Sequence, residues 1–139
     1  MSINHEAAIL REIAPFAILD TKKLKLLAFM SKLVVYDAGE VILRQGDKGD
    51  ALFVLVEGAI EISISTPGAR PLVCEMGRHT FFGEIAVMRS SVRAATVTAK
   101  TNIAVLRISK EVLYEVIDDE PELGRLIAEH IDKSGYTIP

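Results

Sequence analysis

Apolar and polar positions along the chain divide it into a β-type centre and two helical ends. In the centre, short segments rich in β-branched residues alternate with glycine-containing turns. Within residues 60–65 apolar and polar residues alternate strictly, which is typical of a strand with one face on a core. The pattern predicts strands at residues 32–36, 40–44, 51–57, 59–66, 70–76, 96–100 and 103–108.

The spacing of these strands predicts antiparallel pairing. Turn residues follow each segment closely, whereas parallel neighbours need crossovers of about a dozen residues or more. We therefore expect a mainly β fold with flanking helices, built on an antiparallel β-roll, a double-stranded jelly-roll-like barrel.

Both ends of the chain have the periodicity of helices. Residues 6–13 and 21–30 are predicted helices before the roll. After the roll, Ser109 can cap one helix, and Pro121 suits the first position of a last helix that ends near Gly135. One face of that last helix has the stripe Leu123, Leu126, Ile127, His130 and Ile131.

Length and composition fit a single globular domain over residues 1–139, with 50% hydrophobic and 25% charged residues. We expect helices over 1–30, the roll over 31–108 and helices over 109–135. The net charge of −3 argues against a general nucleic-acid binder, so we expect no direct nucleic-acid contact.

Membrane and secreted classes are not indicated. The longest apolar run, residues 51–56, is far too short to span a bilayer, and residues 1–6 do not resemble a signal peptide. The single cysteine, Cys74, cannot form an intrachain disulfide, which fits a cytoplasmic protein. His5, His79 and His130 are too scattered to predict a metal site.

The segment from Phe81 to Val97 contains the most informative chemistry. Gly83 precedes residues 84–88, a stretch too short for a full helix, and the first free amides of a helical turn attract anions. Arg93 can supply a fork of donors to the same anion. Glu84 would repel a bare phosphate but accepts hydrogen bonds from hydroxyls, so the pair fits a sugar phosphate. Alternatively, the two side chains only form a salt bridge beside a turn.

At these residues the sequence resembles the cyclic nucleotide-binding domain family, from about residue 15 to residue 131. The phosphate-binding cassette of that family reads Phe-Gly-Glu-Ile-Ala and, after a short gap, Arg-Ala-Ala-Thr-Val. This chain has these residues at 82–86 and 93–97, within a segment of 82–97. Residues 38–42 and 44–50 also match the glycine-punctuated roll. The family commonly has proline where this chain has Val92, which removes a fixed φ but no contact group.

The resemblance implies a role for each cassette residue. Glu84 would bind the ribose 2′-hydroxyl, and Arg93 would bind the cyclic phosphate. The other implied ligand-binding positions are Gly83, Ile85, Ala86, Ala94 and Ala95 around the phosphate, and Phe82, Leu72, Cys74 and Ile127 around the base.

The resemblance also implies a cyclic nucleotide sensor that has no catalytic activity and no cofactor beyond its ligand. Ala94 stands where guanine-preferring relatives have threonine, which favours cyclic AMP, with cyclic GMP as the other option. Binding would shift the C-terminal helices, and an unidentified effector protein or domain would read that shift. We expect the strands to fill their own core, so that the last helix covers the base as a loosely held lid, and we expect a monomer.

Other interpretations remain for the whole chain and for single residues. The chain could be an orphan member that serves as a protein–protein scaffold, although Glu84 and Arg93 count against it. It could be an enzyme of the sandwich or barrel type, although acid pairs and metal ligands are missing. Cys74 and His79 could form a thiol–imidazole pair, but a buried strand cysteine is favoured. His130 either contacts the base or is a half-buried helix residue.

Overall fold

The computed structural model of the chain describes residues 3–83 and 92–134. Two helices, α1 (Ile3–Arg11) and α2 (Thr21–Met30), flank the 3-10 turn η1 (Phe16–Ile18), and α4 (Lys110–Asp119) and α5 (Pro121–Ser134) follow the strands. The strands are β1 (Lys32–Tyr36), β2 (Val41–Leu43), β3 (Ala51–Glu57), β4 (Ala59–Ile64), β5 (Leu72–Gly77), β6 (Phe81–Phe82), β7 (Thr96–Ala99) and β8 (Ile103–Ser109).

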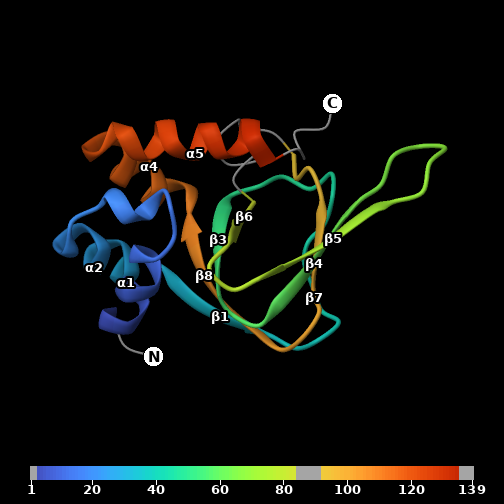
Figure 1. Ribbon diagram of the computed structural model, residues 1–139, viewed down its shortest axis with the longest axis horizontal. Helices are drawn as coiled ribbons and strands as arrows, with labels where there is room; N and C mark the ends of the chain where they lie inside the picture. Colours follow the sequence, from blue (N-terminus) through green and yellow to red (C-terminus); the bar gives the residue numbers. More distant parts are fainter. Residues whose placement is uncertain (1–2, 84–91, 135–139) are drawn as a thin grey trace.

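The described strands form two four-stranded antiparallel sheets, in the orders β1-β8-β3-β6 and β2-β7-β4-β5. Figure 1 shows the helices gathered on one side of the first sheet and the second sheet on its other side. The ribbon formed by β4, β5 and the loop between them, residues 59–77, projects beyond the body of the molecule (Figure 1). The predicted antiparallel β-roll with helices at both ends is confirmed.

Most predicted elements form within a few residues of the expected bounds. Two further elements, η1 and β6, were not predicted, since each is too short to show a periodicity. The short helical stretch expected at residues 84–88 lies outside the described residues. Within the described ranges, no helix is both long and apolar enough to cross a membrane.

Strand β3 is buried on both faces because it lies between two cores. The helix-side core lies between the first sheet and the helices, and it includes Leu10, Phe16, Leu24, Leu27, Leu52, Val54, Phe81, Leu106, Ile108, Leu113, Leu123 and Ile127. The barrel core lies between the sheets and consists of Leu43, Ala51, Phe53, Leu55, Ile60, Ile62, Phe82, Val97, Ala99, Ile103 and Val105.

The expectation that the strands fill their own core without the last helix is wrong. Leu123 and Ile127 of this helix are fully buried in the helix-side core. The outer face of the first sheet is itself apolar, because β3 and β8 present a second row of hydrophobic residues there, and helices must cover it. The side chains of His130 and Ile131 lie outside the described part of the chain.

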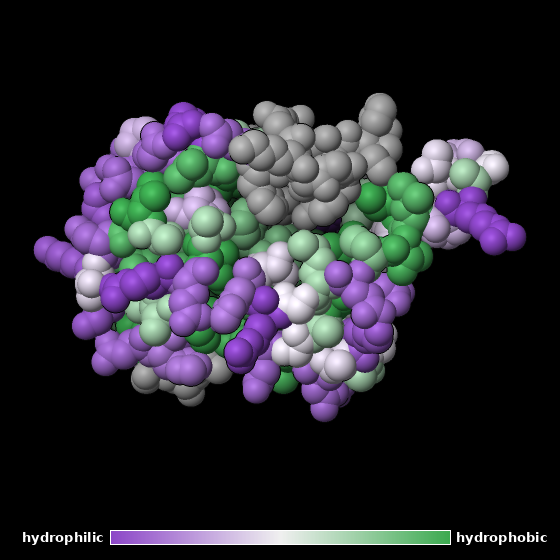
Figure 2. All heavy atoms as spheres, viewed as in Figure 1, coloured by the Kyte–Doolittle hydropathy of each residue, from purple (hydrophilic) through white to green (hydrophobic). Residues whose placement is uncertain are grey.

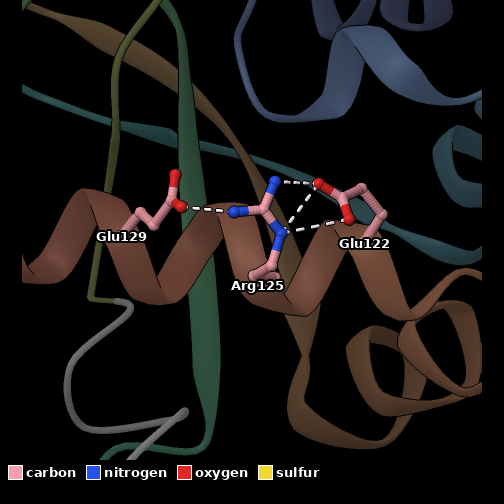
Figure 3. A network of polar contacts seen from close by, with 3 residues as sticks. All are labelled: Glu122, Arg125 and Glu129. Carbon is pink, nitrogen blue, oxygen red and sulfur yellow. Dashed lines mark hydrogen bonds and ion pairs between the residues drawn. The ribbon is translucent and has the colours of Figure 1, made fainter.

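The opposite face of α5 is charged (Figure 3). The Arg125 Nε–H group donates to both Glu122 oxygens, at 2.9 and 3.1 Å, and the guanidinium also pairs with Glu129. The hydrogen bond from Arg125 lowers the pKa of Glu122. Because one face is apolar and the other is charged, α5 packs in a single orientation.

Two further contacts fix the C-terminal helices. As predicted, Ser109 caps α4, because its hydroxyl accepts a hydrogen bond from the Val112 amide at 3.2 Å. Lys23 of α2 reaches the end of α4, with its Nζ 3.1 Å from an Asp119 carboxylate oxygen and 3.4 Å from a Glu120 one. The N-terminal and C-terminal helices therefore form one layer.

Candidate functional site

Strand β6 brings the chain to Gly83 and is anchored in both cores. The Phe82 ring stacks on Phe53 in the barrel core, with centroids 5.3 Å apart and planes 7° apart. Phe81 points to the other side and meets the edge of Phe16 in the helix-side core at 5.8 Å. The position of the following residue, Gly83, is thus linked to the packing of both cores. Phe82 itself is a core residue, with a relative exposure of 1%.

Gly83 can only be glycine in this geometry. Its φ of +86° lies in the region that side chains rarely adopt. A Cβ atom there would also lie 2.6 Å from Nη1 of Arg93 and 3.3 Å from the carbonyl oxygen of Ala51. The glycine therefore lets the arginine approach the backbone closely.

Arg93 is buried, with a relative exposure of 5%. Its Nη1 donates a hydrogen bond of 2.9 Å to the carbonyl oxygen of Gly83, and its guanidinium carbon lies 5.8 Å from the Phe53 ring centroid. The structure thus brings together Gly83 and Arg93, as the sequence predicted. Glu84, Ile85 and Ala86 lie outside the described residues, and with them the alternative of a salt bridge from Glu84 to Arg93.

The loop before β3 holds the backbone of Arg93. The Arg93 amide donates to the carbonyl oxygen of Asp47 at 2.6 Å, and the Gly46 amide donates to the carbonyl oxygen of Arg93 at 3.0 Å. Val92, which is half exposed, forms a β-bridge with Lys48. These bonds fix the segment without the restricted φ that proline would supply at residue 92.

A cavity of about 330 Å³ lies beside Arg93, and sequence reasoning missed most of its lining. Its charged lining residues are Arg44, Asp47, Lys48, Asp50, Arg93 and Arg107. One of these arginines, Arg107 of β8, forms an ion pair of 3.1 Å with Asp50. In the sequence, the feature that could have indicated this lining was Arg107, a charged residue within a mostly apolar strand. Because the cations outnumber the carboxylates, the cavity favours an anion.

Leu72 and Cys74 lie on β5, opposite Ile64 and Ile62 of β4. Residues opposite each other in an antiparallel pair share a face, so both lie on the barrel-core side of the sheet. Leu72 is nevertheless 60% exposed. Figure 2 shows hydrophobic surface where the ribbon leaves the body and polar surface at its tip. The two residues thus present an open apolar surface.

The interpretation of Cys74 as a buried strand cysteine is wrong. The thiol is exposed because β5 is an edge strand with a single neighbour. A pairing of Cys74 with His79 has no support either. The Nε2 atom of His79 instead lies 2.9 Å from a carboxylate oxygen of Glu12, which follows α1.

The remaining predicted positions differ in their surroundings. Ala94 and Ala95 are half-buried and directly follow Arg93. Ile127 has a relative exposure of 0% in the helix-side core, so it offers no surface to a ligand in this structure. Among the described residues, no group of three or more His, Cys, Asp or Glu side chains could hold a metal ion.

The chain is similar to known proteins over most of its length. The family model described as the cyclic nucleotide-binding domain matches residues 33–120. The chain is 33% identical over 111 residues to the cAMP-dependent protein kinase regulatory subunit of Dictyostelium discoideum, covering 72% of this chain and 34% of that protein. It is 31% identical over 113 residues to the cGMP-dependent protein kinase egl-4 of Caenorhabditis briggsae, covering 79% of this chain and 15% of that protein.

A solved structure shows the same fold. The regulatory domain of Toxoplasma gondii PKA, crystallised with cAMP, superposes with a TM-score of 0.86 at 20% sequence identity, covering 94% of this chain and 50% of that one. The chain spans about a third or less of the length of the curated relatives named above.

Proposed function

Since the chain belongs to the cyclic nucleotide-binding domain family, we propose that it is a regulatory module that binds cyclic AMP beside Arg93 and couples occupancy to its C-terminal helices. The observation that carries this proposal is the contact between the buried guanidinium of Arg93 and the carbonyl of Gly83. It holds a charged donor at a glycine whose missing side chain leaves room for the guanidinium.

The phosphate end of the site is preorganised for an anion. A charge-assisted hydrogen bond from a partly desolvated guanidinium is stronger than one in water. The neighbouring cations Arg44, Lys48 and Arg107 add a positive field around the same cavity. No catalytic group is needed for this role, and binding alone accounts for the arrangement.

The base end lies at β5. The exposed surface of Leu72 and Cys74 offers an apolar contact for a purine on the side of the sheet that continues into the barrel core. Ala94 has no hydroxyl to offer to a guanine. Cyclic GMP therefore gains no hydrogen bond at this position, which favours cyclic AMP.

We assign the coupling to β6. Phe82 lies in the barrel core, where it stacks on Phe53, and Phe81 lies in the helix-side core that also contains Leu123 and Ile127 of α5. A ligand that moves Gly83 also moves both aromatic residues, and the close packing of the cores transmits that displacement. In this proposal Ile127 responds to the ligand through the core and does not cover it. An effector protein or domain, in the cytoplasm, then reads the position of α5.

Calorimetric titration of the full chain with cyclic AMP tests the proposal. We expect the wild-type chain to bind and Arg93→Ala to weaken binding roughly 10- to 150-fold, because a hydrogen bond to a charged group is lost. Arg78→Ala, which removes an exposed arginine, is the matched control and should bind normally. A wild-type chain that binds neither cyclic AMP nor cyclic GMP would refute the proposal and leave the scaffold alternative.

Ligand preference is tested at Ala94. The wild-type chain should bind cyclic AMP more tightly than cyclic GMP, and Ala94→Thr should raise the affinity for cyclic GMP more than for cyclic AMP. Ala95→Thr is the control, since it adds the same hydroxyl one residue later. Equal or tighter binding of cyclic GMP by the wild-type chain would overturn the assignment of the base.

A further inference from the structure

The β4–β5 ribbon leaves the second sheet before it reaches Leu72. Strand β4 pairs with β7 from Ile60 to Ser63, and the last pair joins Ser63 to Thr96. Beyond that pair, Ile64 has Leu72 as its only strand partner among the described residues. The backbone pairing between β4 and β7 therefore ends at Ser63, one residue before Ile64, which is the partner of Leu72.

Where this strand pairing ends, the side chain of Gln45 hydrogen-bonds the backbone of the ribbon. The Gln45 Nε2–H group donates to the carbonyl oxygen of Ser65 at 2.9 Å, and the Ser65 amide donates to Gln45 Oε1 at 2.8 Å. The side-chain amide thus satisfies the backbone of Ser65 as a neighbouring strand would. The main-chain amide of Gln45 also donates to Thr96 Oγ1 at 3.0 Å.

The residues next to Gln45 bind the other end of the site. Gly46 and Asp47 exchange hydrogen bonds with the backbone of Arg93, at 3.0 and 2.6 Å. A continuous path therefore leads from Leu72 through Ile64 and Ser65 to Gln45, and from there to Arg93. Each step is a hydrogen bond, a strand pair or a peptide bond.

We propose that Gln45 is a positioning residue of the ligand site, whose side-chain amide fixes the distance between the apolar surface at Leu72 and the guanidinium of Arg93. This inference rests on the proposed function, in which these two ends bind the base and the phosphate. A ligand that contacts both ends gains most when the ribbon is already in place, because less ordering is needed on binding.

Gln45 contacts neither end itself, so its effect depends on which parts of the ligand are present. A ligand with a base needs the ribbon in position. A base-free ligand that binds only at the arginine does not. A general loss of structure would weaken both ligands alike, and this difference separates positioning from stability.

The test compares cyclic AMP with the methyl glycoside of ribose 3′,5′-cyclic phosphate, which lacks the base, in titrations of the full chain. Gln45→Ala should weaken cyclic AMP binding about 5- to 10-fold, since two hydrogen bonds that order the ribbon are lost. Binding of the base-free ligand should change by less than about twofold. Gln45→Glu should also weaken cyclic AMP binding, because its carboxylate can still accept from the Ser65 amide but cannot donate to the Ser65 carbonyl, which it faces with like partial charge.

Ser65→Ala is the matched control. Both hydrogen bonds between the Gln45 side chain and Ser65 involve the main chain of Ser65. This variant therefore keeps them and should bind both ligands as the wild-type chain does. In the absence of ligand, the amide of residue 65 should exchange its hydrogen faster in Gln45→Ala than in the wild-type chain.

The outcomes separate the two proposals. A wild-type chain that binds neither ligand refutes the proposed function, and the role of Gln45 falls with it. If the wild-type chain binds and Gln45→Ala weakens both ligands equally, or weakens neither, the positioning role alone is refuted.

Discussion

The two sheets of the roll differ most at strands β3 and β5. Strand β3 has an apolar core on each face, and its first six residues are all buried. Strand β5 has one neighbour, and its residues are exposed except for one that is half-buried. Both strands are rich in hydrophobic residues, so hydrophobicity alone does not distinguish a structural strand from one that presents its surface.

This difference separates a structural framework from an exposed surface. The helices and the first sheet fix the framework, and the open edge of the second sheet leaves the apolar surface of Leu72 exposed. Strand β6 joins the two regions through Phe81 and Phe82, which point into different cores. Substitutions in the framework should therefore mainly lower stability, whereas substitutions at the open edge should mainly weaken ligand binding.

The largest contrast is expected between two leucines. Leu106→Ala removes a fully buried side chain from the helix-side core and should lower the free energy of unfolding by about 2–5 kcal/mol. Leu72→Ala, on the exposed edge, should change it by less than about 0.5 kcal/mol and weaken cyclic AMP binding instead. Urea denaturation and calorimetry measure the two effects. If Leu72→Ala destabilises the chain as much as Leu106→Ala, the division into two regions is wrong.

A second contrast separates the effect of a strained backbone from the effect of a collision with Arg93. Gly83→Ala and Gly39→Ala both place a side chain at positive φ, +86° and +92°, and in each the strained backbone should cost about 1–2 kcal/mol of stability, to which the collision at Gly83 adds. At Gly83 the new Cβ would collide with the Arg93 guanidinium, whereas at Gly39 no atom of the described residues, apart from the two chain neighbours, lies within 4 Å of the corresponding position. Cyclic AMP binding should fall in Gly83→Ala alone, and an equal fall in both variants would refute the close approach at Gly83.

The role of Ile127 is tested by a smaller change. Ile127→Val should lower the stability of the ligand-free chain by about 0.5–1.5 kcal/mol, because the residue belongs to the helix-side core. A residue that only covered the ligand would leave the stability of the ligand-free chain unchanged. Thermal unfolding without nucleotide measures this, and an unchanged melting temperature would return Ile127 to the role of a lid.

The smallest effect concerns the charged face of α5. Arg125 lowers the pKa of Glu122, so the pair contributes stability above the unfolded pKa of about 4.3 and loses it as the pH falls through the lower folded value. Acidification from pH 7 towards pH 3 should therefore cost Arg125→Ala slightly less stability than it costs the wild-type chain. Melting temperatures at the two pH values check this, and the binding of cyclic AMP at pH 7 should not change.

The sequence predicted the roll well because its strands are punctuated by glycines. Ser109, Pro121 and the alternation within β4 placed the elements near their observed bounds. That Gly83 and Arg93 lie close together agrees with the prediction that both approach one anion, which came from the cassette motif at residues 82–86 and 93–97. The burial of Cys74 was mispredicted because periodicity shows which face of a strand is apolar but not what covers that face.

The role of Gln45 had no local signal in the sequence. Its partners, Ser65 and Thr96, lie 20 and 51 residues away, and one of them is contacted through its main chain. Such contacts depend on where two strands separate, which is a property of the folded sheet. The same holds for Arg107, whose neighbours in the cavity come from several segments.

In the proposed binding mode, the ligand extends between Arg93 and the open edge at β5. Hydrogen exchange of the full chain, with and without saturating cyclic AMP, tests it most directly. We expect slower exchange in β5 and in residues 92–95 when the nucleotide is present, and no change in β3 and β8, whose amides are already protected between the two cores. Exchange in β5 and residues 92–95 that is equally fast with and without cyclic AMP would contradict the account.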